Sequence, residues 1–165
     1  MSIIKGFKAF NAGLISVYDF TFEENKCYHV EGEVVYRKNG FHFCEHLEDT
    51  LKYYTNTNND VDIAKVIGFG KVIKKEVEGF STDDYEVCVA SDIKILNKLT
   101  REEIIEEMQK HQYNLTRMTR FITCYKLTDE EIKELTENFE YDILNSYIEY
   151  YQYGDKDAFK RRKKR

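Results

Sequence analysis

The sequence predicts an α+β protein: a mostly antiparallel sheet with one inserted helix, followed by a C-terminal helical segment of two or three helices. Up to residue 99, apolar and aromatic residues lie in short runs separated by Gly, Asn and Asp, which is the pattern of a sheet. From residue 100 they recur at helical spacing. With 42% hydrophobic and 33% charged residues, the 165-residue chain can bury a core and is not wholly disordered. We therefore expect an α+β domain (1–99), a helical extension packed on it (100–154) and a basic, disordered tail (155–165).

The strands of the first part are expected in six runs. They are IIKGFKAF (3–10), CYHVE (27–31), EVVYR (33–37), GFHFC (40–44), DIAKVIGFGKVIKKEV (62–77) and YEVCVASDIKIL (85–96). The Asn-Gly pair in RKNG (37–40) is typical of a tight hairpin, because both residues accept positive φ angles. The inserted helix is HLEDTLKYY (46–54), where Leu47, Leu51 and Tyr54 have helical spacing, and TNTNND (55–60) is an exposed loop.

Two capping boxes mark helix starts in the second part, Thr100 with Glu103 and Thr128 with Glu131. The second box opens one long helix of about 25 residues that ends at Gly154. Its apolar stripe consists of Ile132, Leu135, Phe139, Ile143, Tyr147 and Tyr151. Another helix is expected between the boxes. Arg117 and Arg120 on it could form a cationic face for a phosphate or a carboxylate, but we favour a solvated face bonded to nearby Glu.

Composition limits the classes of function. No apolar run approaches the roughly 20 residues of a membrane helix, and the N-terminus lacks the apolar segment of a secretion signal. The four cysteines are widely spaced and show no CxxC pair. We therefore expect reduced thiols in the cytoplasm of a bacterial host, and no membrane association.

Charge is divided unevenly along the chain. The tail (155–165) holds seven of the 25 basic and two of the 30 acidic residues, so it carries +5 and the preceding body −10. An acidic body repels nucleic acid, which could bind only through the tail.

The GFHFC run raises three possibilities. Cys27, His29, His42 and Cys44 would form a Cys₂His₂ zinc set if their two runs paired with each other, although zinc ligands usually lie in CxxC knuckles. Cys44 could instead be a nucleophile with His42 or His46 as its base. The third possibility, which we favour, is a structural strand with a partly buried cysteine. We therefore expect neither a metal nor a cofactor.

The segments KGFKAF, GEVVYRKNGFHFCEHLEDTLKYY, AKVIGFGKVIKKE and DIKILNKLTREEI resemble an uncharacterised domain family found in phage and prophage proteins. The resemblance covers about residues 3–108 and implies a mobile-element origin.

The strand–helix unit GFHFCEHLEDTLKYY is also similar, more distantly, to one in ADP-ribosyltransferase-like folds. That similarity implies an NAD pocket with His42 and Phe43 in its wall and Tyr53 or Tyr54 stacked on the nicotinamide. The chain departs from such enzymes on its first strand, which offers Lys5 and Lys8 where they have Arg or His, and its late strands offer no clear equivalent of the catalytic glutamate beyond Glu86.

The most unusual surface feature is the tyrosine run SYIEYYQY (146–153). Tyr is enriched at interfaces because it buries area and keeps a polar group. We expect Tyr150 and Tyr153, with Lys160, Arg161 and Arg162 of the tail, to contact a partner. The sequence thus predicts a non-catalytic phage or mobile-element accessory protein that binds and modulates or inhibits a host or defence protein. Self-association through the C-terminal helices and an NAD-dependent ADP-ribosyltransferase are the alternatives.

Overall fold

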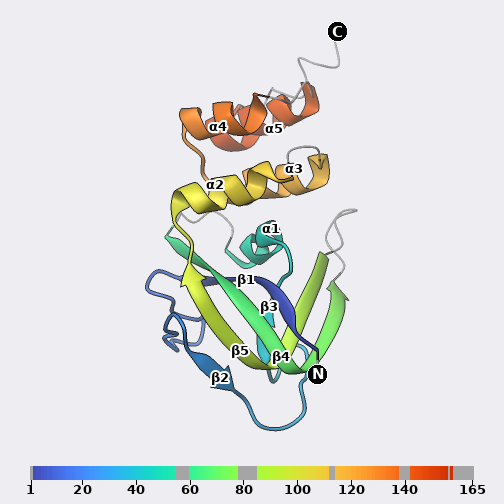
Figure 1. The fold of residues 1–165 in the computed structure, drawn as a ribbon. Coiled ribbons are helices and arrows are strands. Elements are labelled where there is room, and N and C mark those ends of the chain that lie inside the picture. Colours follow the sequence, from blue (N-terminus) through green and yellow to red (C-terminus); the bar gives the residue numbers. More distant parts are fainter. Residues whose placement is uncertain are drawn as a thin grey trace.

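The computed structural model describes residues 2–54, 60–77, 85–111, 114–137, 142–155 and 157. Within them, one antiparallel sheet is followed by a stack of helices, which confirms the α+β class (Figure 1). The strands are β1 (Ile4–Asn11), β2 (Cys27–His29), β3 (Phe41–Phe43), β4 (Val61–Val77) and β5 (Tyr85–Lys98). The helices are α1 (Leu47–Thr50), the 3₁₀ turn η1 (Leu51–Tyr53), α2 (Arg101–Gln109), α3 (Leu115–Cys124), α4 (Asp129–Thr136) and α5 (Asp142–Tyr153).

The sheet curls until its two edges meet. Its order is β1-β4-β5-β2, and β3 pairs with β5 as well. Directly after β3, Cys44 forms an antiparallel bridge to Phe7 of β1, with N–O distances of 2.7 and 2.9 Å. A Cβ on the neighbouring Gly6 would lie 2.3 Å from the Cys44 carbonyl oxygen, so the glycine of KGFKAF permits this contact. Both faces of β3 are consequently covered: Phe43 and Cys44 are each 2% exposed, in two different core clusters.

A β-bulge interrupts the long β4–β5 hairpin. Gly70 and Lys71 of β4 lie opposite Ser91 of β5, between the pairs Phe69–Asp92 and Val72–Ala90. Gly70 has φ +77°, and a Cβ on it would lie 2.2 Å from the Asp92 carboxylate. The bulge therefore requires glycine and leaves space for the polar side chains of Ser91 and Asp92.

The helices stack on one end of the sheet, with α1 against the strands, α2 and α3 above it, and α4 and α5 outermost (Figure 1). One core cluster joins them to the sheet; it includes Phe7, Ile63, Leu51, Met108, Phe121 and Ile148. Both predicted capping boxes are present, on α2 and α4.

Two ion pairs connect α1 to α3. Arg117 bonds to Glu48 and Arg120 to Asp49, and neither carboxylate is more than 4% exposed. Arg117 bonds to a glutamate as predicted, but the predicted solvated face is wrong for Arg120, which is 7% exposed and bonds to Asp49.

Three further expectations differ from the structure. The single long helix is two helices, since α4 ends at Thr136 and α5 begins at Asp142. EVVYR is not a strand and has only an isolated bridge between Val35 and Asn39. In the RKNG turn, Arg37 has φ 62° and Gly40 has φ 126°, while Asn39 keeps a negative angle, because the chain reverses before the Asn-Gly pair. None of the helices in the described segments is long and apolar enough to cross a membrane.

Candidate functional site: an aromatic cavity beside the GFHFC strand

A cavity of about 820 Å³ lies beside β3. Its wall is assembled from β1, residues 16–22, β2, the turn at 36–40, β3, the end of the α1–η1 segment and Val87 of β5. The curling of the sheet creates this space, because the bridge between Cys44 and Phe7 joins the end of the GFHFC run to β1. We call it the aromatic cavity.

One side of the aromatic cavity is a cluster of rings from residues 18–28. Phe22 lies at its centre, with ring centroids 4.8 Å from both Phe20 and Tyr28 in edge-to-face geometry. The Ser16 hydroxyl accepts hydrogen bonds from the backbone N–H groups of Tyr18 and Phe20, which shapes the turn that presents these rings. Tyr18 is 87% exposed and Phe20 50%, so the ring cluster continues from the cavity onto the surface.

The wall also carries Tyr36, Phe41, Phe43 and Tyr54, and the Phe41 ring lies 6.1 Å from that of Phe22. The Tyr36 ring lies 5.7 Å from the His42 ring, and the Arg37 guanidinium lies over it at 5.1 Å. Among the described residues, the buried Tyr36 hydroxyl has no hydrogen-bond partner. An unsatisfied buried hydroxyl costs about 1–3 kcal/mol, so a polar ligand atom here would be stabilising.

His42 supports the turn. Its Nε2 accepts the Arg37 backbone N–H at 2.9 Å, which leaves the proton on Nδ1 to be donated to the Gly40 carbonyl at 3.2 Å. Burial and the nearby Lys8 lower the pKa of His42, in agreement with this neutral form. Both ring nitrogens are thus engaged by the residue's own turn, which disfavours His42 as a general base.

Lys8 of β1 supplies an ammonium group to the cavity wall. Its Nζ donates a hydrogen bond to the His42 carbonyl at 2.8 Å, and burial lowers the pKa of Lys8 to about 8. Arg37 and Lys38 add two exposed cations. No Asp or Glu is among the described residues of the wall, although the chain has 30 acidic and only 25 basic residues. The aromatic cavity is a cationic, ring-lined site on an acidic protein.

The candidate transferase residues do not come together. His42 and Tyr54 line the aromatic cavity, and the Tyr54 hydroxyl donates to the Ala9 carbonyl at 3.3 Å. Glu86 is not among the described residues of this wall, although its neighbour Val87 is.

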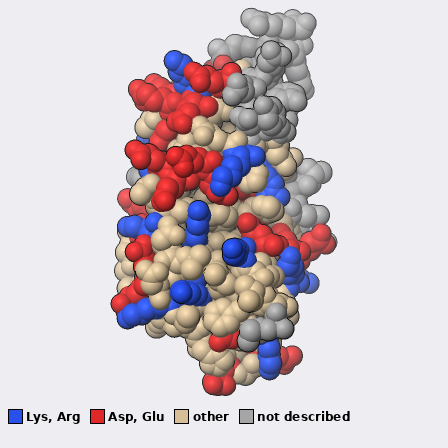
Figure 2. All heavy atoms as spheres, viewed as in Figure 1, with Lys and Arg blue, Asp and Glu red and all other residues tan. Residues whose placement is uncertain are grey.

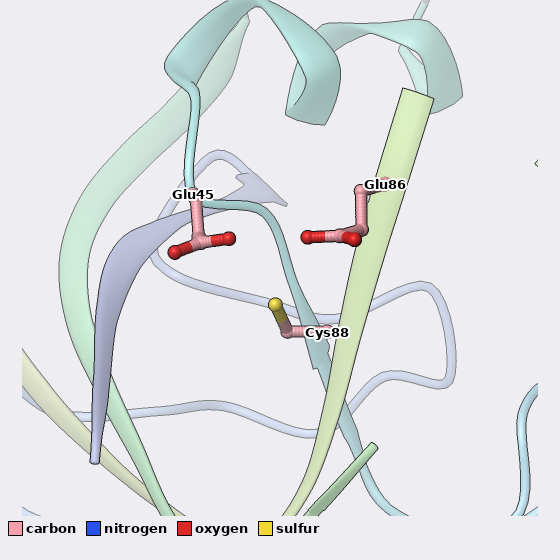
Figure 3. Close-up of side chains that lie close together, drawn as sticks. All are labelled: Glu45, Glu86 and Cys88. Carbon is pink, nitrogen blue, oxygen red and sulfur yellow. The ribbon is translucent and has the colours of Figure 1, made fainter. Parts of the chain in front are cut away.

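Glu86 instead lies with Glu45 and Cys88, whose ligand atoms are all within 4.8 Å of one another (Figure 3). The Lys74 ammonium bonds to this cluster, 2.7 Å from Glu45 and 3.3 Å from Glu86. Burial raises the pKa of Cys88 to about 11, which favours the thiol, a poor metal ligand, at neutral pH. The two carboxylates of the cluster are instead bridged by the Lys74 ammonium.

The four residues of the possible zinc set are also separated. β2 and β3 do not pair with each other but occupy different parts of the same edge of β5, where Cys27 faces Lys94 and Phe43 faces Cys88. These two points are six residues apart, about 20 Å along a strand. Cys27 is exposed, whereas Cys44 is buried and its pKa is raised by that burial, which also disfavours Cys44 as a nucleophile.

A hydrogen-bonded chain of polar residues borders the aromatic cavity at the bulge. Ser91 donates to Asp92 at 2.5 Å, and Asp92 bonds to Nδ1 of His29 at 2.8 Å. This bond raises the pKa of His29, which lines both the aromatic cavity and a second hollow of about 430 Å³. From the sequence, His29 is predicted only as a possible zinc ligand, and no sequence motif indicates that Asp92 lies beside it.

The residues assigned to partner contact lie on the helical stack, away from the aromatic cavity. Tyr150 is 39% and Tyr153 58% exposed, and the Tyr153 hydroxyl donates to Asp129 of α4 at 2.6 Å. Lys160, Arg161 and Arg162 lie outside the described residues. Figure 2 shows Asp and Glu gathered over α2 and α4 in this view.

The chain belongs to the family described as "Domain of unknown function (DUF7666)", because that family's sequence model matches residues 4–107, more than half of the chain. The matched region contains the whole sheet, α1 and most of α2, and thus the aromatic cavity. No curated protein and no solved structure matches.

Proposed function

We propose that the aromatic cavity binds a small anionic molecule that carries a planar ring, with nucleotides as the ligand class. The observation that carries this proposal is the composition of the wall, which combines eight Phe and Tyr rings with Lys8, Arg37 and Lys38 and has no carboxylate among its described residues. A cavity of about 820 Å³ is within the roughly 300–1,000 Å³ of small-molecule sites. Stacking of a base on an aromatic side chain contributes about 1–3 kcal/mol.

The proposal is one of binding and not of ADP-ribosyl transfer. A transferase of that kind commonly has a catalytic glutamate in its pocket, and neither Glu86, which bonds to Lys74, nor another Glu is among the described residues of this wall. We further propose that this chain is an accessory protein of phage or prophage origin that acts in the bacterial cytoplasm, as the sequence resemblance suggests.

Thermal unfolding with a panel of ligands tests the proposal. The panel contains nucleoside mono-, di- and triphosphates, NAD⁺ and the matching uncharged nucleosides. A ligand at 100 times its Kd stabilises the folded state by about 2.7 kcal/mol, which raises Tm by about 5–10 °C for a chain of this size. We expect a rise for at least one nucleotide and a smaller rise for its nucleoside; no rise with any nucleotide at millimolar concentration would contradict the proposal.

Two variants, with Lys5→Gln as a control, test whether the ligand binds in the aromatic cavity. Lys8→Gln should weaken binding, whereas Lys5→Gln on the same strand should not, because Lys5 is exposed outside the cavity. Tyr36→Phe keeps the ring and removes the unpartnered hydroxyl. It should leave the free protein as stable as the parent or more so, and weaken ligand binding about two- to tenfold, the value of one hydrogen bond. Equal losses in Lys5→Gln and Lys8→Gln would place the ligand elsewhere.

A second candidate function, binding of a host or defence protein, is favoured by the exposed tyrosines of α5. Tyr150, Tyr151 and Tyr153 are 39%, 47% and 58% exposed. A pull-down from bacterial lysate, with sedimentation analysis of the purified chain, would compare Tyr150→Ser/Tyr151→Ser with the parent. Tyr18→Ser is the matched control, since Tyr18 is exposed on the sheet side. Retention of the same partner and the same oligomeric state by the double variant would exclude this surface.

A further inference from the structure

Lys8 differs from four other lysines of the described segments, Lys26, Lys74, Lys98 and Lys110. Each of these forms an ion pair with Asp or Glu. Lys8 has no carboxylate of the described residues within ion-pair distance and makes a hydrogen bond to a neutral carbonyl, that of His42. The nearest ring on its own strand is Phe10, 5.5 Å from Nζ. The amine thus lies in the ring-lined wall of the aromatic cavity, without a carboxylate of the described residues as its counter-ion.

This environment favours the neutral amine. Burial lowers the pKa of Lys8 to about 8, whereas its ordinary value is 10.5. Near neutral pH, a larger share of the molecules then carries a neutral amine at Lys8 than at an exposed lysine. A neutral amine has a free electron pair, and lysines desolvated in this way serve as nucleophiles toward carbonyl compounds.

We propose that Lys8 forms an imine with an aldehyde or ketone that is held in the aromatic cavity. The inference rests on the proposed function, because the carbonyl compound enters the same cavity, and it adds a covalent step. The wall defines the compound's chemistry: a planar ring for the aromatic side chains, an anionic group for Arg37 and Lys38, and a carbonyl group for Lys8.

The step is balanced without an oxidant or reductant. The Nζ electron pair attacks the carbonyl carbon, and the carbonyl oxygen takes up a proton to give a carbinolamine. That hydroxyl leaves as water with one more proton, while the nitrogen loses its protons and forms the C=N bond. The sum is amine plus carbonyl giving imine plus water. The Tyr36 hydroxyl, which has no partner among the described residues, is a proton donor in the same wall.

Pyridoxal 5′-phosphate is a suitable probe, since it combines a planar ring, a phosphate and an aldehyde. The full-length chain is incubated with it between pH 6 and 10, the imine is reduced with cyanoborohydride, and the labelled lysines are mapped by peptide mass spectrometry. We expect Lys8 to be labelled at least tenfold faster than Lys5 at pH 7.5, with a rate that reaches half its maximum near pH 8. The analogue without the aldehyde, 4-deoxypyridoxine 5′-phosphate, should slow labelling of Lys8 and leave that of Lys5 unchanged.

The outcomes separate this inference from the proposed function. Labelling of Lys8 no faster than that of Lys5, or with a half-maximum near pH 10, overturns the imine. If the deoxy analogue raises Tm and Lys8 is still not labelled selectively, the cavity binds ligands and the covalent step is wrong. A lack of both thermal shift and selective labelling overturns the imine, and the nucleotide panel then decides the binding proposal separately.

Discussion

The ion pair between Arg120 and Asp49 gives the sharpest prediction about stability. Their side chains are 7% and 5% exposed, so replacing Arg120 by Met leaves a buried carboxylate without its cation. Removing one partner of a buried pair costs about 3–5 kcal/mol, several times the value of a surface pair. In urea, with a slope of about 2 kcal/mol per molar, the unfolding midpoint should fall by about 2 M.

The pH dependence of this loss follows from Asp49. Burial raises its pKa, and Arg120 opposes that rise. When Arg120 is absent, the pKa of Asp49 in the folded variant rises further above the ordinary pKa of aspartate. Between these two pKa values, the folded variant keeps a proton on Asp49 that the unfolded chain has released. A raised pKa contributes stability at low pH that is lost as pH rises. Arg120→Met should therefore cost less at pH 5 than at pH 8.

Urea unfolding followed by circular dichroism at both pH values measures these effects. Lys110→Met is the matched control, because the Lys110 side chain, which pairs with Glu107, is 64% exposed; this variant should cost less than 1 kcal/mol. In Asp49→Asn/Arg120→Met the orphaned charge is gone, so this variant should be more stable than Arg120→Met alone. The reasoning is refuted if Arg120→Met resembles Lys110→Met, or if its cost is the same at pH 5 and pH 8.

Three more predictions concern single residues. Gly70→Ala should lose about 1–3 kcal/mol of unfolding free energy, and more than Gly154→Ala, because both glycines have positive φ but only Gly70 lacks space for a Cβ. Gln152→Ala should lose about 2–3 kcal/mol in urea unfolding, since its amide bonds the Leu127 N–H and the carbonyls of Ile122 and Tyr125. A thiol reagent at pH 8 should modify Cys27 well before Cys44 and Cys88, because Cys27 is exposed and burial raises the pKa of the other two. Mass spectrometry measures the three rates, and equal rates would contradict the prediction.

Local signals predicted most of the elements. The capping boxes at Thr100 and Thr128 and the β-branched runs of β4 and β5 are where the sequence placed them. The division between α4 and α5 could not be predicted, because the apolar stripe keeps its helical spacing across the break and no Pro or Gly marks it.

The candidate site depended on contacts that the sequence does not show. Lys5 and Lys8 are three residues apart and so lie on opposite faces of a strand, but only the closing bridge from Phe7 to Cys44 shows which face borders a cavity. In the same way, the partners of Arg117 and Arg120 lie about 70 residues earlier, on α1. Periodicity predicts an element and which residues share a face of it. Which residues pack against each face depends on the tertiary fold.

The region matched to the family ends at residue 107, within α2, but the folded unit continues beyond that residue. Glu48 and Asp49 of α1 are buried in the matched region, and the arginines that neutralise them belong to α3, beyond it. The same α1–η1 segment brings Thr50 and Tyr54 to the wall of the aromatic cavity. The helices beyond the match therefore support one wall of the proposed ligand site, and Arg120→Met should weaken ligand binding although Arg120 is not among the residues of that wall. Calorimetry at pH 8 with a nucleotide that stabilises the parent tests this. Unchanged affinity in the folded variant would show that the cavity wall does not depend on α3.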